Sequence, residues 1–169
     1  MDSLIIFGAK YLFIAVPLLY LLAWLQANRR YKALLALAFI IAGIAAVILD
    51  KISAKLYYDP RPFVAHHLKP LVAHAADNGF PSDHTLFTIT IATALIFYRP
   101  KLGTLAFIIG LLVGISRVAA HVHSPIDIIG AALMGIAAGW LGYYLASKVL
   151  HAVAGTAKQV PHQANKRQD

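Results

Sequence analysis

The chain has 169 residues, of which 60% are hydrophobic and only 13% are charged, and its formal net charge is +8. A soluble domain carries about 25% charged residues, so this composition excludes an ordinary soluble protein and predicts several membrane-spanning helices. The absence of cysteine excludes disulfides and thiolate metal sites. The cations lie between long apolar runs, so the positive charge indicates orientation in a membrane rather than binding of nucleic acid.

Five apolar segments follow one another along the chain, and each is predicted to form a helix. A helix needs about 20 apolar residues to cross a bilayer, a length that the first, second and fifth segments reach with ease and the third does not. The first segment is too long, and begins too close to the acidic Asp2, for a cleavable signal peptide. The segments lie roughly at residues 4–26, 32–56, 84–98, 101–120 and 125–150.

These segments predict an all-α fold, a polytopic transmembrane bundle of five to six helices. One membrane-embedded domain is expected over residues 1–154. The polar tail that follows, residues 155–169, lacks the apolar content of a packed segment, and we expect it to be disordered and cytoplasmic.

Lysine and arginine are distributed unequally between the two sides of the predicted bundle. The side with more of these residues is expected to be cytoplasmic, so the N-terminus and the long loop face outward. Lys10 lies inside the first segment, and we expect its ammonium to extend toward the outer interface. The inner side receives Arg29, Arg30, Lys32, Arg99, Lys101, Lys148, Lys158, Lys166 and Arg167, and the outer side receives Lys51, Lys55, Arg61, Lys69 and Arg117.

Residues 57–83 form the long loop on the predicted outer side. Its four prolines exclude a continuous helix, but residues 63–76 are expected to form a short interfacial helix that would count as a partial sixth helix. Three histidines in the loop leave a metal site of three imidazoles open as an alternative to ordinary interfacial side chains. The prolines are Pro60, Pro62, Pro70 and Pro81, and the histidines are His66, His67 and His74.

Three polar clusters stand at the outer ends of the apolar segments. The first ends the second segment and contains Lys55 and Arg61, the latter flanked by two prolines. Arginine offers a planar fork of donors that suits phosphate, and lysine offers a point charge. Taken alone, this cluster is more typical of an ordinary helix end with cations that extend to the interface.

The second cluster, Pro81-Ser82-Asp83-His84, opens the third segment. Ser82 is a favoured N-cap residue, and the free N–H groups of a helix start bind anions. His84 lies in the first turn, where it could donate a proton to a leaving oxygen. Alone, this pattern is more typical of a plain helix start.

The third cluster joins the fourth and fifth segments. Asp127 could hold one ring nitrogen of His123 and leave the other free to attack phosphorus, while Arg117 would neutralise phosphoryl oxygens. The alternative is a turn between helices with a buried salt bridge. The functional interpretation is favoured because these matched groups lie within twelve residues, from Ser116 to Asp127.

Together the clusters resemble the three-part signature of the type 2 phosphatidic acid phosphatase superfamily: Lys-x6-Arg-Pro, Pro-Ser-Gly-His and Ser-Arg-x5-His-x3-Asp. The third part matches at every position, and the second matches except at Asp83, which replaces glycine. The first part matches at Arg61 and the proline after it, but Lys55 stands one residue too close, and Lys51 is a weaker substitute. Within the superfamily, the chain is most similar to bacterial undecaprenyl-diphosphate phosphatases of the bacitracin-resistance type.

The resemblance implies a helical core like that of haloperoxidases and an active site without a metal or other cofactor. It implies that His123 attacks phosphorus and forms a phosphohistidine, that Asp127 orients this histidine, and that His84 protonates the leaving group. The residues implied to hold the phosphoryl oxygens are Lys55, Arg61, Ser82 and Arg117.

The expected function is hydrolysis of undecaprenyl diphosphate to undecaprenyl phosphate and phosphate, at the outer face of a bacterial inner membrane, in support of cell-wall synthesis. The expected partners are a lipid phosphate and the bilayer, without nucleic acid, and the oligomeric state stays open. Phosphatidylglycerophosphate, phosphatidate and lipid A are alternative substrates. A non-catalytic lipid or ion transporter is an alternative of another class, but its charges should lie in mid-helix, whereas these lie at segment ends.

Overall fold

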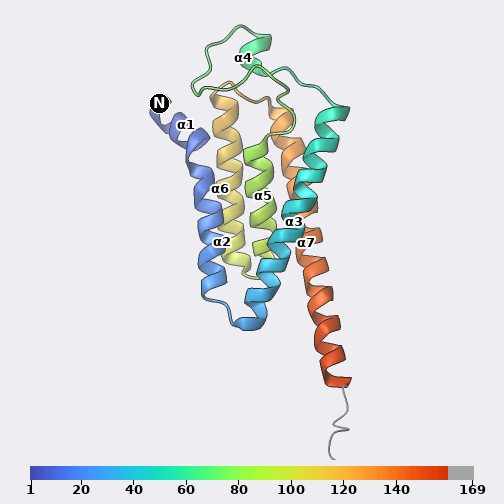
Figure 1. Ribbon diagram of the computed structural model, residues 1–169. Helices are drawn as coiled ribbons and strands as arrows, with labels where there is room; N and C mark the ends of the chain where they lie inside the picture. The colour runs from blue at the N-terminus through green and yellow to red at the C-terminus, as the bar shows by residue number, and fades with distance from the viewer. Residues whose placement is uncertain (160–169) are drawn as a thin grey trace, which may run out of the picture.

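The computed structural model describes residues 1–159, and the side chains of residues 1–153. Within that range the chain is helical, with no strand beyond an isolated bridge between Pro60 and Asn78. Figure 1 shows an upright bundle in which the long helices run side by side. The elements are α1 (Asp2–Lys10), the 3₁₀ helix η1 (Leu12–Ile14), α2 (Ala15–Leu25), α3 (Arg29–Leu56), α4 (Pro62–Ala65), α5 (Asp83–Ile96), α6 (Pro100–Ala119) and α7 (Pro125–Gln159).

Helix α5 lies at the centre of the bundle, in contact with α2, α3, α6 and α7. Ten of its 14 residues are buried, and four of these are threonines. Because protein rather than lipid surrounds this helix, it needs neither the full length nor the wholly apolar surface of a helix that faces the bilayer. The short third segment of the sequence is therefore the core helix of the bundle, and the second polar cluster is its N-terminus.

Small residues let the neighbouring helices approach α5 closely. A Cβ atom at Gly139 of α7 would overlap the carbonyl oxygen of Thr90, and one at Gly110 of α6 would lie 3.0 Å from Ile89. Close approach at small residues is the usual way in which membrane helices associate. This packing places α6 and α7, whose connection carries the third polar cluster, against the same central helix.

Within the described residues, three helices are long and apolar enough to cross a membrane: α3, α6 and the part of α7 over Pro125–Val153. Helix α1 and the stretch Leu12–Leu25, which are bent by 41° relative to each other, pass the same test together and would make a fourth if they form one broken span. Many large apolar side chains on these helices are exposed, which suits a surface in contact with lipid. The chain is a membrane protein, and each of the five predicted segments contains a helix, although the first is interrupted near Tyr11.

The expectation of an interfacial helix over residues 63–76 is wrong, because helical structure in this loop ends at Ala65. His67 has a φ of 53°, a left-handed conformation that interrupts a right-handed helix. Pro70 then lacks the backbone N–H that a continuing helix would need. The loop therefore supplies only the single turn of α4.

The loop folds down over the connection between α6 and α7 instead. The backbone N–H groups of Phe63 and Leu71 each donate to carbonyl oxygens of this connection, at His121 and Ala120, over 3.1 Å. Apolar side chains of the loop pack there against the end of α1. The contacting residues are Phe63, Leu71 and Val72 from the loop, and Ala9, Ala120 and Val122 from the helices and their connection.

All three polar clusters lie at one end of the bundle, and the α2–α3 and α5–α6 turns lie at the other (Figure 1). Helix α7 continues to Gln159, beyond the predicted end of the membrane domain at residue 154. Residues 160–169, the rest of the predicted tail, lie outside the described residues. The turns at the far end carry five of the cations predicted to be cytoplasmic: Arg29, Arg30, Lys32, Arg99 and Lys101.

Candidate active site

The three polar clusters meet at the loop end of the bundle, where the structure buries an unusual number of polar side chains. Burial of ionisable groups is costly unless they are paired, so such a cluster in a membrane protein indicates function. The buried residues, with their exposed fractions, are Arg61 (5%), Ser82 (0%), Arg117 (4%), His123 (2%) and Asp127 (0%).

The ring of His123 is held in one tautomer. Its Nδ1 lies 2.9 Å from the carbonyl oxygen of Gly79 and 3.2 Å from Oδ2 of Asp127. A carbonyl oxygen can only accept, so Nδ1 carries the proton and donates it. Nε2 then keeps an unprotonated lone pair, which accepts a hydrogen bond from Nη1 of Arg61 over 3.3 Å. This is the form in which a histidine can act as a nucleophile.

The charge state of His123 suits the same role. Burial lowers the pKa of His123 from its ordinary value, and the positive charges of Arg117 and Arg61 lower it further, while the hydrogen bond to Asp127 opposes the shift. The net lowering keeps the ring neutral at neutral pH. Asp127 also accepts a hydrogen bond of 2.9 Å from the backbone N–H of Ser124, which fixes the carboxylate beside the ring.

Besides the bond to His123, three hydrogen bonds hold the guanidinium of Arg61 in place. Its Nε donates to Asp77 over 2.8 Å, its Nη1 to the carbonyl oxygen of Val122 over 2.9 Å, and its Nη2 to that of Asn78 over 3.1 Å. The same bond to Arg61 lowers the pKa of the Asp77 carboxyl. Arg61 is therefore aimed at His123 before any ligand binds.

Arg117 and Ser82 complete the buried set. Arg117, in the last turn of α6, donates from Nη1 to the carbonyl oxygen of Ala9 over 3.0 Å, and its buried Nε has no partner among the described residues. Ser82 is the N-cap residue of α5, as the sequence predicts, but its side chain makes no cap bond. Its hydroxyl accepts from Thr85 over 3.2 Å instead.

Two residues that the sequence analysis did not identify support this arrangement. The Asn78 side chain accepts from the N–H groups of Asp59 and Phe80, over 2.9 and 3.0 Å, and donates to two carbonyl oxygens at the end of α3. It thereby joins the first cluster to the second. Next to it, Gly79 packs so tightly that a Cβ atom would lie 2.8 Å from Oδ2 of Asp127. The Asn-Gly pair is a turn signal, and only that signal could have drawn attention to it.

A cavity of about 350 Å³ opens beside this cluster. Basic side chains line it together with apolar residues of α1 and the loop, and the half-buried His84 lies in its wall, where its ring packs edge-on against Phe13 at 4.8 Å. An imidazole in this wall can exchange a proton with a group that enters the cavity. The basic residues are Lys10, His74, His84 and Arg117.

The structure does not bring Lys55 into the cluster. Its side chain is exposed, with no hydrogen bond or ion pair to another described residue. Lys51, the substitute considered from the sequence, is also exposed and lies 3.4 Å from the carboxylate of Asp50. A phosphate contact by either lysine stays a prediction.

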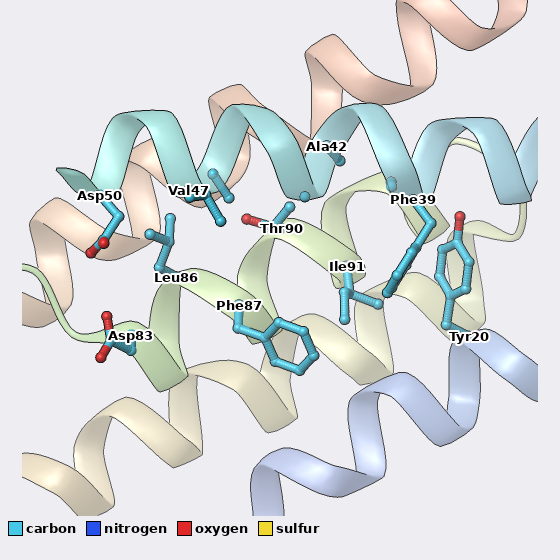
Figure 2. Close-up of a pocket in the computed structure, with 13 residues that line it drawn as sticks. Tyr20, Phe39, Ala42, Val47, Asp50, Asp83, Leu86, Phe87, Thr90 and Ile91 are labelled. Atoms are coloured by element: carbon cyan, nitrogen blue, oxygen red, sulfur yellow. The ribbon is translucent and has the colours of Figure 1, made fainter. Parts of the chain in front are cut away.

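Asp83, the departure from the signature glycine, faces away from this cavity. It lines a second, largely apolar cavity of about 370 Å³ between α3 and α5. Figure 2 shows its carboxylate pointing toward that of Asp50, at the end of the cavity opposite Tyr20. An aspartate is therefore accommodated at this position because its side chain lines the second cavity, whereas the neighbouring His84 lines the first.

Comparisons with known proteins agree with this geometry. Residues 31–150 match the PAP2 superfamily. The chain is 38% identical over 141 residues to the undecaprenyl-diphosphatase BcrC of Bacillus subtilis, covering 83% of this chain and 72% of that protein. It is 35% identical over 137 residues to the putative undecaprenyl-diphosphatase YbjG of Escherichia coli, with coverage of 80% and 69%.

A third relative carries a different kind of name. The chain is 30% identical over 150 residues to the bacitracin transport permease protein BcrC of Bacillus licheniformis, covering 88% of this chain and 73% of that protein. The family match extends over all three polar clusters and most of the helical bundle. The chain therefore belongs to the PAP2 superfamily, and the resemblance inferred from its signature residues is confirmed.

Proposed function

We propose that this chain is a membrane lipid-diphosphate phosphatase that hydrolyses undecaprenyl diphosphate to undecaprenyl phosphate and phosphate. Relatives that carry the name undecaprenyl-diphosphatase support this assignment. The observation that carries the chemistry is the geometry of His123, whose unprotonated Nε2 lies beside Arg61 within a buried cationic site.

The reaction proceeds in two displacements. In the first, Nε2 of His123 attacks the terminal phosphorus, the bond from phosphorus to the bridging oxygen breaks, and His84 gives a proton to the leaving lipid monophosphate. Asp127 and the Gly79 carbonyl stabilise the positive charge on the His123 ring. In the second, water attacks the phosphohistidine, its proton passes to His84, and phosphate leaves.

The cations of the site stabilise the transferring phosphoryl group. Arg61 and Arg117 neutralise the charge that spreads over its oxygens, and their burial strengthens this interaction. The chain's own residues therefore supply a nucleophile, a proton donor and charge stabilisation, the three requirements of phosphoanhydride cleavage.

The enzyme is proposed to reside in the bacterial inner membrane with its active site on the outer side. The excess of lysine and arginine at the opposite end of the bundle supports this orientation. A diphosphate lipid left on the outer surface is then accessible to the cavity beside His84.

A transporter is a weaker alternative. The ionisable residues of the site lie in loops, in the first turns of α5 and α7 and in the last turn of α6, whereas transport sites lie near the bilayer midplane. The name of the Bacillus licheniformis relative mentions transport, so the alternative is tested directly by the assay below.

The assay measures phosphate released by the purified chain in detergent from undecaprenyl diphosphate, phosphatidylglycerophosphate, phosphatidate and lipid A. We expect the highest kcat/KM for undecaprenyl diphosphate, and loss of several orders of magnitude in His123→Ala. The matched control is His151→Ala, at an exposed histidine of α7 far from the site in the chain. A higher kcat/KM for another lipid would overturn the substrate assignment. Release of phosphate from none of the four lipids would overturn the assignment as an enzyme.

A further inference from the structure

The cavity beside the nucleophile contains two basic residues that the signature does not. His84 and Arg117 belong to the signature, whereas Lys10 comes from α1 and His74 from the long loop. No carboxylate of the described residues lines this cavity. Lys10 lies outside residues 31–150, the part of the chain that matches the superfamily. The cavity is therefore lined by more basic residues than the signature alone supplies.

His74 lies against the nucleophile. The centres of the His74 and His123 rings are 5.9 Å apart, with the rings edge-on at 79°. The Nδ1 atom of His74 is buried without a hydrogen-bond partner among the described residues, and so is Nε of Arg117. Buried polar atoms left unpaired are costly, and in the Nδ1-protonated tautomer both of these atoms are donors. A ligand with several acceptor oxygens would remove this cost.

The neutral charge state of His74 suits a hydrogen-bond donor that does not exchange protons during the reaction. Burial lowers the pKa of His74 to about 4, and the nearby charges of Arg61 and Arg117 contribute to the shift. At neutral pH the ring is therefore neutral, with one N–H to donate. The same positive charges that lower its pKa are those that attract a phosphate group.

The break in the first membrane segment places Lys10 at the cavity. Helix α1 ends at Lys10, and the carbonyl oxygen of Ala9, free at the helix end, accepts from Arg117 over 3.0 Å. At Gly8 the helix packs so closely on α6 that a Cβ atom would overlap Ser116. The Lys10 ammonium lies 5.3 Å from the centre of the Tyr11 ring, a contact that is weak when exposed. A phosphate anion can therefore draw the ammonium into the cavity.

We propose that His74 and Lys10 bind the substrate directly, with His74 donating to the phosphoryl group that His123 attacks and Lys10 supplying the cation that the signature assigns to a lysine. This role rests on the proposed phosphatase function. It also explains why the site tolerates the exposed position of Lys55, since the cavity already holds a lysine from another helix. The ligand class is a phosphate monoanion or dianion, free or attached to a lipid.

The test measures binding of inorganic phosphate to the purified full-length chain by titration calorimetry, which needs no turnover. His74→Phe keeps the edge-on ring packing and removes the N–H, and His74→Gln keeps a donor. We expect His74→Phe and Lys10→Met each to weaken phosphate binding by at least about tenfold, and His74→Gln to weaken it by less than about threefold. The controls are His66→Phe and Lys69→Met, two exposed residues of the same loop, and both should bind phosphate as the wild type does.

The outcomes separate this inference from the substrate assignment. Wild-type phosphate affinity in both His74→Phe and Lys10→Met overturns the inference, whatever the enzyme hydrolyses. If His74→Gln keeps the wild-type melting temperature but binds phosphate as weakly as His74→Phe, the donor is not the contact, and the role of His74 is refuted. If the variants behave as expected but the wild type releases no phosphate from undecaprenyl diphosphate, this inference stands and the proposed substrate fails.

Discussion

Replacement of Asn78 by alanine tests whether the loop between the first and second clusters organises the site. The side chain makes four hydrogen bonds of 2.9 to 3.1 Å, two as acceptor and two as donor. Each such bond contributes a net stability of about 0.5–1.5 kcal/mol. Since one of them is exposed and such contributions are not additive, we expect Asn78→Ala to lower the free energy of unfolding by about 2–4 kcal/mol.

The expected loss of activity exceeds what this loss of stability explains. The backbone around Asn78 supplies the Gly79 carbonyl oxygen that fixes His123 and the Asn78 carbonyl oxygen that holds Arg61. A displacement of about 1 Å at such a position can lower the rate by about a hundredfold. We therefore expect kcat to fall by roughly 10- to 100-fold at a temperature where the variant is still folded.

Steady-state phosphate release and thermal unfolding, measured on the same detergent-solubilised sample, give both quantities. The control is Asn28→Ala, which removes the side-chain acceptor for Tyr31 at the start of α3, at the far end of the bundle. That change should cost about 1 kcal/mol of stability and leave kcat unchanged. A folded Asn78→Ala variant with wild-type kcat/KM would refute the organising role of this loop.

Three further predictions concern the site and its orientation. Gly79→Ala should lower kcat by about a hundredfold, because the new Cβ atom would lie 2.8 Å from the Asp127 carboxylate; wild-type kinetics would show that the loop relaxes at no cost. Because the pKa of His123 is lowered, protonation should remove the nucleophile only below the ordinary histidine value of about 6.5, so a pH profile of kcat/KM with an acid midpoint above that value contradicts the assignment. In a chain without cysteine, Ala75→Cys should react with an impermeant thiol reagent on intact cells and Lys101→Cys only after lysis; the reverse pattern inverts the proposed orientation.

The helical architecture could be predicted from the sequence because apolar length and the positions of charges follow directly from the cost of polar groups in lipid. Apolar length and charge positions did not predict the structure of the long loop, where the sequence favours an interfacial helix that the structure does not contain. There the conformation depends on the left-handed His67 and on hydrogen bonds to the distant residues Ala120 and His121. Contacts between residues so far apart in the chain leave no local pattern.

The meeting of the signature residues could likewise be predicted from the sequence, and five of them lie buried together in the structure. The supporting residues could not. The Gly79 carbonyl oxygen acts through the backbone, and nothing in a glycine side chain reports that role. The sequence marks Lys10 only as a cation inside an apolar segment, because its place at the cavity depends on the break that ends α1. Residue spacing also could not predict where the Lys55 side chain points, because helix α3 ends at the next residue and the spacing of a helix no longer applies beyond it.

Trapping of the phosphorylated enzyme tests the central claim, that His123 carries the phosphoryl group. The purified chain would be mixed with undecaprenyl diphosphate labelled in the terminal phosphate, quenched in alkali within one turnover, and digested for mass spectrometry. We predict an acid-labile, alkali-stable phosphate on the peptide that contains His123, and none in His123→Ala. Steady hydrolysis of the substrate without any label on His123, or with the label on another residue, would contradict the account.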